Sequence, residues 1–185
     1  LFRWLRLNQW IATKAVGWLP LTLYDKTQWG PSRKTERETW ISEHLRGKRC
    51  YGGVDLSSTT DMTAFVLLFP PQPGLETAVW LPYIWRSGKD LKRAEDHDHA
   101  NYQDWERAGF LTICEGDSTD YEDVERVIAE ATALYDLQMV GFDPYLSRTI
   151  TQRLSPIVNI IEIPQDIKNM SPAMKEIEQG IRKRQ

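Results

Sequence analysis

Hydrophobic and polar positions follow two different patterns along the chain, and the change from one to the other predicts the order of the elements. Between residues 51 and 85, short runs rich in β-branched and aromatic residues are separated by turn-forming residues, which is typical of consecutive antiparallel strands. We expect these strands at residues 51–57, 62–69 and 77–85. Residues 58–61 are predicted to form the first hairpin turn, and the proline-rich residues 70–74 a loop.

Helical spacing follows the three strands. Residues 89–108 are polar with a few apolar positions at helical spacing, and residues 110–114 suit another short strand. In residues 121–135 apolar side chains recur every three or four positions, which predicts an amphipathic helix. Thr119 and Glu122 at its start have the spacing of a capping box, in which a hydroxyl and a carboxylate satisfy free amides of the first turn.

The remaining pattern alternates strands and helices. We expect a strand at residues 138–142, a helix at 147–154, a strand at 158–163 and a last helix opening at Ser171-Pro172. A strand reached through a helix returns parallel to an earlier strand by a right-handed crossover. The order therefore predicts an α/β fold with a mixed sheet, in which a three-strand antiparallel meander is extended by parallel strands and flanked by helices.

Residues 1–50 differ from the rest in charge and in aromatic content. They hold 10 Lys and Arg against 4 Asp and Glu, whereas residues 51–185 hold 13 against 22. Five of the eight tryptophans precede residue 41, and residues 35–45 have the apolar spacing of a helix. We interpret this segment as a connector with helical pieces that packs its tryptophans on a neighbour. Its positive charge suits either a nucleic-acid-binding arm or an ordinary solvated surface.

Composition and missing motifs exclude several classes of protein. With 41% hydrophobic and 26% charged residues the chain is globular rather than disordered or fibrous. No apolar run approaches the roughly 20 residues of a membrane-spanning helix. Cys50, Cys114 and three histidines lack the spacing of a zinc site, and a reducing compartment is expected. Phosphate-binding glycine loops and a nucleophile elbow are also absent, which argues against a nucleotide-hydrolysing motor or a nucleophilic triad in this stretch.

Two aspartates end predicted strands. Asp55 follows an apolar, glycine-containing run, and Asp143 ends another. If these strands are adjacent and parallel, both carboxylates emerge at one sheet edge, where their repulsion is relieved by a cation such as Mg²⁺ or Mn²⁺. Asp61, six residues after Asp55, suits a further ligand. All three residues also suit plain turns at strand ends, so both interpretations stay open.

Other acidic residues have simpler explanations. Asp117 suits either a metal ligand or, more simply, a favourable charge near the N-terminus of the next helix. Residues 95–99 (EDHDH) resemble a metal cluster at first sight. Adjacent residues on a helix point in different directions, so a solvated face is the better interpretation.

Five segments in the same order resemble the large terminase subunit of tailed double-stranded DNA phages. They are residues 5–10 (LRLNQW), 51–64 (YGGVDLSSTTDMTA), 102–109 (YQDWERAG), 141–145 (GFDPY) and 170–174 (MSPAM). In that family an N-terminal ATPase pumps DNA into the procapsid and a C-terminal nuclease of the ribonuclease H type cuts the concatemer. The resemblance implies that residues 1–49 are a linker and the end of the ATPase domain, and that residues 50–185 are a ribonuclease H-like nuclease domain lacking its C-terminal part.

The resemblance also implies an activity and a setting. The chain would be a metal-dependent endodeoxyribonuclease, with Asp55 and Asp143 as catalytic, metal-binding carboxylates and Asp61 as an accessory metal ligand. A pair of Mg²⁺ or Mn²⁺ ions would be the cofactors. Double-stranded DNA, the portal protein and the small terminase subunit would be its partners in the host cytoplasm, on the procapsid, away from any membrane. ATPase activity is expected only of the full-length protein.

One departure from the family pattern keeps alternatives open. The family has a further acidic residue near its C-terminus, often in a Lys-x-Asp-Gly-like segment, which does not occur before Gln185, and Glu176 and Glu178 do not match it. We therefore expect either a fragment cut at both ends or an incomplete two-metal site. A resolvase- or transposase-type enzyme of the same fold, or a noncatalytic interaction module, remains an alternative.

Overall fold

The computed structural model describes residues 19–27, 33–57, 61–144 and 148–183. The chain forms two compact units. The larger comprises residues 30–173 and contains the whole sheet, and the smaller comprises residues 1–29 together with 174–185. Each unit is considered by itself.

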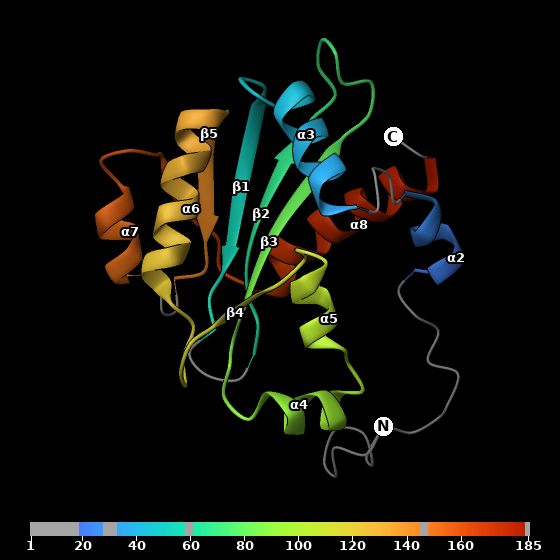
Figure 1. The fold of residues 1–185 in the computed structure, drawn as a ribbon. Coiled ribbons are helices and arrows are strands. Elements are labelled where there is room, and N and C mark those ends of the chain that lie inside the picture. Colours follow the sequence, from blue (N-terminus) through green and yellow to red (C-terminus); the bar gives the residue numbers. More distant parts are fainter. Residues whose placement is uncertain (1–18, 28–32, 58–60, 145–147, 184–185) are drawn as a thin grey trace. The chain divides into compact units, whose positions relative to one another are not determined.

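A six-stranded mixed sheet forms the centre of the larger unit (Figure 1). Its spatial order is β4-β3-β2-β1-β5-β6. The strands are β1 (Arg49–Asp55), β2 (Thr63–Phe69), β3 (Val79–Ser87), β4 (Thr112–Cys114), β5 (Asp136–Phe142) and β6 (Ile160–Glu162).

The strand directions bring the C-terminal ends of several strands to one edge of the sheet. β1, β2 and β3 form an antiparallel meander, whereas β5 runs parallel to β1, β6 parallel to β5 and β4 parallel to β3. The predicted meander extended by parallel strands is confirmed, and each end of an expected strand lies within two residues of the observed end. The C-terminal ends of β1, β3, β4, β5 and β6 therefore all lie at the same edge.

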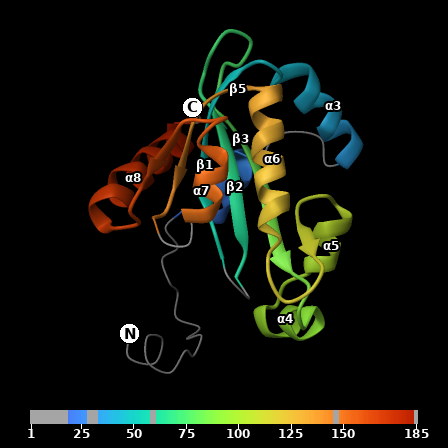
Figure 2. The ribbon, with the colours of Figure 1, turned by 90° about the vertical axis from the view of Figure 1, so that its left-hand side faces the viewer.

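One face of the sheet carries the hydrophobic core. Figure 2 shows α3 (Lys34–His44) and α6 (Tyr121–Leu134) on the same side of the strands. α7 (Arg148–Leu154) contacts α6. Fully or almost fully buried side chains come from the strands and from α6 and α7; they include Phe65, Leu67, Phe69, Val140, Phe142, Val124, Ile128, Ile150 and Leu154. The packing of these side chains fixes the positions of α6 and α7 on the sheet.

The start of α6 differs from the predicted capping box. Asp120 is the N-cap residue, and its carboxylate accepts hydrogen bonds from the backbone N–H groups of Glu122 and Asp123. Thr119 is instead buried, and its hydroxyl has no hydrogen-bond partner among the described residues. The prediction was wrong by one residue because a carboxylate caps as well as a hydroxyl and adds a favourable charge at the helix N-terminus.

The last helix, α8 (Ile167–Lys183), begins before the predicted Ser171-Pro172 start. Asp166 Oδ1 accepts the backbone N–H of Asn169 at 2.8 Å, which caps the helix at its observed beginning. Pro172 therefore lies inside the helix, where its ring removes one backbone donor. The capping carboxylate, rather than the proline, sets where the helix begins.

Residues 89–108 form two helices rather than one. α4 (Leu91–Asp98) ends at His99, which has a left-handed φ of 52°, and α5 (Tyr102–Arg107) follows. Gly109, with φ of +74°, follows Ala108, the C-cap residue of α5. The break at His99 changes the chain direction, a feature that apolar spacing does not encode.

The segment before β1 is partly helical, as predicted. The smaller unit contains α2 (Leu21–Tyr24) and the short 3₁₀ helix η1 (Asp25–Thr27). In the larger unit, α3 packs Trp40 and Ile41 against the core. The other four tryptophans of the N-terminal segment lie outside the described residues, and the domain boundary at residue 49 stays a prediction. No described helix combines the length and apolar character needed to cross a membrane.

Candidate active site

Asp55 and Asp143 lie at the ends of neighbouring parallel strands. Val54 on β1 is in register with Phe142 on β5, so the next residue on each strand is one of the two aspartates. Val54 and Phe142 are both buried in the core, and alternation along a strand directs the following side chains to the other face. The predicted adjacency of the two strand ends is confirmed, whereas the chemical roles of the aspartates stay predictions.

Glycines precede both carboxylates on the same face. Gly53 on β1 is paired with Gly141 on β5, two residues before Asp55 and Asp143 respectively. A Cβ atom at Gly53 would have no described heavy atom within 4 Å, which leaves open space next to Asp55. A glycine inside a strand often marks a place where another backbone or a ligand approaches closely.

Asp55 Oδ1 accepts a hydrogen bond from the side-chain amide of Gln165, with an Nε2–Oδ1 distance of 3.2 Å. Gln165 follows β6, whose C-terminal end reaches the same sheet edge. Sequence reasoning missed this residue. Its position shortly after a parallel strand was the available signal, because ligand sites in α/β sheets lie beyond the carboxyl ends of strands.

The chain immediately after Asp55 is held on both sides. The backbone N–H of Ser57 donates to Thr63 Oγ1 at 2.9 Å, and the Tyr121 hydroxyl donates to the Ser57 carbonyl oxygen at 2.8 Å. Burial raises the pKa of Tyr121, so its hydroxyl keeps the proton that it donates. Thr63 is fully buried, and a buried threonine at a strand start was the missed signal for this role.

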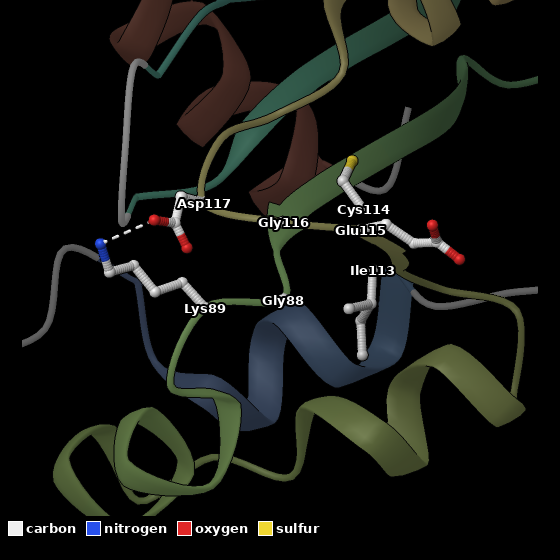
Figure 3. A pocket seen from close by; sticks show the side chains of 7 residues that line it. All are labelled: Gly88, Lys89, Ile113, Cys114, Glu115, Gly116 and Asp117. Atoms are coloured by element: carbon white, nitrogen blue, oxygen red, sulfur yellow. Dashed lines mark hydrogen bonds and ion pairs between the residues drawn. The ribbon is translucent and has the colours of Figure 1, made fainter.

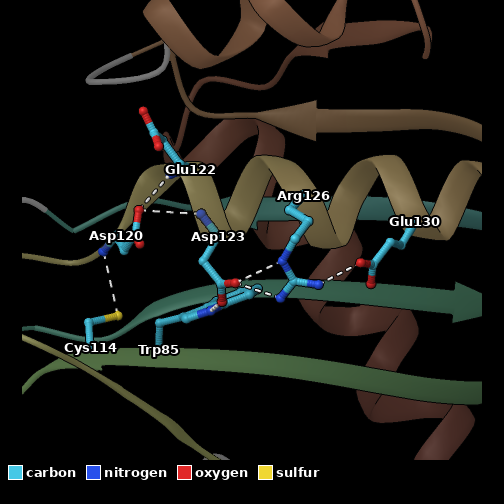
Figure 4. A network of polar contacts seen from close by, with 7 residues as sticks. All are labelled: Trp85, Cys114, Asp120, Glu122, Asp123, Arg126 and Glu130. Carbon is cyan, nitrogen blue, oxygen red and sulfur yellow. Dashed lines mark hydrogen bonds and ion pairs between the residues drawn. The ribbon is translucent and has the colours of Figure 1, made fainter.

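α6 is tied to β3 by a network of polar contacts (Figure 4). Trp85 Nε1 donates to Asp123 Oδ2 at 2.7 Å, and Arg126 bridges Asp123 and Glu130. Burial alone would raise the pKa of Asp123, but the hydrogen bonds from Trp85 and Arg126 outweigh it and hold that pKa below its usual value. The network thereby fixes the helix turn that carries Tyr121.

Asp61 is exposed and lies at the end of the first hairpin turn, of which residues 58–60 are outside the described chain. Asp61 precedes β2, in which Ala64 is paired with Asp55. Within the described ranges, no group of three His, Cys, Asp or Glu side chains is arranged to hold a metal ion. The structure therefore does not gather Asp61 with the other two carboxylates, and its ligand role stays a prediction.

Asp117 lines a separate cleft of about 390 Å³ at the ends of β3 and β4 (Figure 3). It forms an ion pair with Lys89 at 3.1 Å instead of serving the N-terminus of α6, which Asp120 caps. Glu115 also lines the cleft. Two carboxylates against one ammonium group leave the cleft negative, so it does not suit an anion.

The acidic and histidine-rich stretch at residues 95–99 lies at the end of α4 and makes hydrogen bonds to α5. Glu95 accepts two hydrogen bonds from Gln103, which lower the pKa of Glu95. Asp98 is contacted by His97 and by the Tyr102 hydroxyl, and these hydrogen bonds lower the pKa of Asp98. The preferred interpretation was a solvated face, whereas the structure pairs Glu95 and Asp98 with neighbouring side chains.

The sequence of this chain matches a known protein family and is similar to known proteins. Residues 6–185 match the family described as "Terminase large subunit, endonuclease domain". The chain is 32% identical to the terminase large subunit of Enterobacteria phage HK97 over 136 residues, covering 71% of this chain and 26% of that protein. It is 23% identical to protein YmfN of Escherichia coli K12 over 189 residues, covering 97% of this chain and 39% of that protein.

The fold is also that of a solved relative. The crystal structure of the HK97 bacteriophage large terminase superposes with a TM-score of 0.70 at 27% sequence identity, covering 97% of this chain and 35% of that one. This likeness supports the predicted ribonuclease H-like architecture. The chain thus spans about a quarter to two fifths of the relatives it matches. It belongs to the endonuclease-domain family of terminase large subunits.

Proposed function

We propose that this chain hydrolyses phosphodiester bonds of double-stranded DNA at the edge formed by Asp55 and Asp143, and that it cuts concatemeric DNA during phage genome packaging. The observation that carries the proposal is the register of β1 and β5, in which Val54 pairs with Phe142 and each of these residues is followed by an aspartate. The family match supports the substrate and the reaction class.

The donor set at this edge fits a divalent cation. Carboxylate oxygens are hard ligands, and Mg²⁺ is commonly held in proteins by one or two carboxylates while water and substrate phosphate complete its shell. Asp55 and Asp143 would hold such an ion or, with Asp61 and a further ligand, two ions. When bound, divalent cations supply a more acidic water and positive charge against the phosphate oxygens.

Residues of this chain would orient Asp55 and leave room for the substrate beside it. Thr63 accepts a hydrogen bond from the Ser57 N–H, and Tyr121 donates one to the Ser57 carbonyl oxygen. Together they hold the backbone that follows Asp55, which reduces the freedom of its carboxylate. The open space over Gly53 would let a DNA backbone approach the two carboxylates. Positioning of this kind accounts for much of the rate gain in phosphoryl transfer.

The charge distribution bears on the proposed partners. Residues 51–185 hold 22 acidic against 13 basic residues, which opposes tight binding of free DNA through phosphate contacts. We propose that DNA affinity comes from the rest of a longer protein, including an ATPase motor, and from docking to a portal protein and a small terminase subunit on the procapsid. The host cytoplasm would be the site of this assembly.

A noncatalytic interaction module is the second candidate. It is favoured by one observation, the lack of a third carboxylate gathered with Asp55 and Asp143 among the described residues. The two candidates differ in a simple way, because only the nuclease requires the chain to bind Mn²⁺ and to cut DNA.

The experiment measures plasmid cleavage and Mn²⁺ binding by this chain and three variants. We expect Asp55→Asn and Asp143→Asn to reduce cleavage to the level seen without Mn²⁺. Asp136→Asn, at the opposite end of β5, is the matched control and should retain activity. Equal cleavage by Asp55→Asn and Asp136→Asn would refute the assignment, and a wild-type chain that neither binds Mn²⁺ nor cuts would support the interaction module.

A further inference from the structure

Gln165 contacts Asp55 from 110 positions away in the sequence. Its side chain is exposed, and its amide Nε2 lies 3.2 Å from Asp55 Oδ1. It lies outside the five segments that resemble the terminase family. Because Asp55 is one of the two carboxylates in the proposed site, the contact bears on how that carboxylate is oriented.

The backbone on both sides of Gln165 is fixed. The N–H of Ile163 donates to the Phe142 carbonyl oxygen at 2.8 Å, which continues the pairing of β5 with β6 past the end of β6. On the other side, Asp166 caps α8 through Asn169 at 2.8 Å. Gln165 thus lies between a strand contact and a helix cap, which already restrict its backbone. The hydrogen bond to Asp55 therefore costs little additional backbone entropy.

Close packing couples the same loop to β5. A Cβ atom at Gly141 would lie 2.5 Å from Ile163 Cδ1, so only a glycine permits this approach without a shift. Gly141 is two residues before Asp143, and Ile163 is two residues before Gln165. The loop that carries Gln165 is therefore packed directly on the strand that carries Asp143.

The chemistry of an amide suits a carboxylate that binds metal. A glutamine donates an N–H and carries no charge, so Asp55 keeps its full negative charge and its second oxygen as an acceptor. A lysine or arginine in the same place would neutralise the carboxylate and compete with a cation. Neighbours that orient metal ligands by hydrogen bonding usually matter for metal affinity.

We propose that Gln165 is a positioning residue that holds Asp55 by Oδ1 and leaves Oδ2 for a divalent cation. The inference rests on the proposed function, since it requires that Asp55 binds metal. It adds to that function a residue from β6–α8 that none of the recognised motifs contains.

The test measures Mn²⁺ affinity by calorimetry and by electron paramagnetic resonance, without DNA. Gln165→Met keeps the length of the side chain but loses the donor, and we expect affinity to fall about 10- to 100-fold. Gln165→Lys keeps a donor but adds a positive charge, so it should not restore affinity. Gln152→Met, at an exposed position on α7, is the matched control and should bind Mn²⁺ like the wild type.

Three outcomes separate the possibilities. Wild-type affinity in Gln165→Met, with binding abolished in Asp55→Asn, would overturn the role of Gln165 and leave the metal site intact. Full rescue by Gln165→Lys would show that the residue only ties the loop, and would also overturn the proposal. Unchanged affinity in Asp55→Asn would overturn the proposed metal site itself. Circular dichroism and the unfolding midpoint verify that each variant is folded.

Discussion

The Tyr121 hydroxyl on α6 donates a hydrogen bond of 2.8 Å to the carbonyl oxygen of Ser57, two residues after Asp55. α6 is itself tied to β3 through Asp123 and Trp85. A continuous set of contacts therefore runs from the buried face of the sheet, through the first turn of α6, to the backbone beside Asp55. The orientation of the proposed catalytic edge depends on this helix as well as on the strands.

We expect Tyr121→Phe to loosen the segment after Asp55. Loss of one neutral hydrogen bond should lower the free energy of unfolding by about 1 kcal/mol. Under the proposed function, Mn²⁺-dependent cleavage should also fall, because Asp55 would be less well oriented. Urea denaturation and a plasmid assay measure the two effects. Tyr51→Phe, on β1 but four residues from Asp55, is the control, and an equal loss of cleavage there would contradict the prediction.

Gly52 and Gly53 should respond differently to the same substitution. A Cβ at Gly52 would lie 2.8 Å from Phe65 and 3.1 Å from Val140, whereas at Gly53 it would meet no described atom within 4 Å. Overpacking predicts that Gly52→Ala lowers the free energy of unfolding by about 1–3 kcal/mol. Gly53→Ala should leave stability nearly unchanged.

Substitution of Gly53 should also affect DNA cleavage. If DNA approaches Asp55 across Gly53, then Gly53→Ala, and more strongly Gly53→Leu, should reduce cleavage without reducing Mn²⁺ affinity. Urea denaturation, calorimetry and the plasmid assay measure the three quantities. Full cleavage by a folded Gly53→Leu variant would show that the substrate takes another path.

The contact of Trp85 with Asp123 should make stability depend on pH. The pKa of Asp123 is lowered from its ordinary value of 3.8, so the ionised carboxylate stabilises the fold above that value. This contribution is lost as the pH falls through the lower, folded-state pKa. Trp85→Phe removes one donor, so the difference in unfolding free energy from the wild type should be largest near neutral pH and shrink below pH 3.8.

Urea denaturation between pH 2 and 7 measures this dependence. Part of the cost of Trp85→Phe comes from lost packing, because Trp85 is almost fully buried, and that part does not vary with pH. Trp80→Phe is the control, since Trp80 is 50% exposed. A difference for Trp85→Phe that stays constant with pH would contradict the role given to its indole N–H.

Local patterns predicted the element order well because each rests on neighbouring residues. Runs of β-branched and aromatic residues between turn-forming residues marked β1 to β3. The spacing of Val124, Ile128 and Ala131 marked α6, since one face of that helix must be buried. The starts of the helices were predicted less accurately. Asp120 and Asp166 replaced the expected caps because several polar residues near a helix start compete for the same free amides.

The order of hydrophobic and polar residues was enough to predict an α/β sheet and to mark Asp55 and Asp143 as strand-end carboxylates. Only the tertiary structure decided that β1 and β5 pair in a register that places these residues next to each other, and that Gln165 and Tyr121 reach the same segment. The physical reason is the separation along the sequence of the residues involved. Periodicity reports which face of an element is buried, whereas contacts between residues 64 and 110 positions apart depend on how the elements pack.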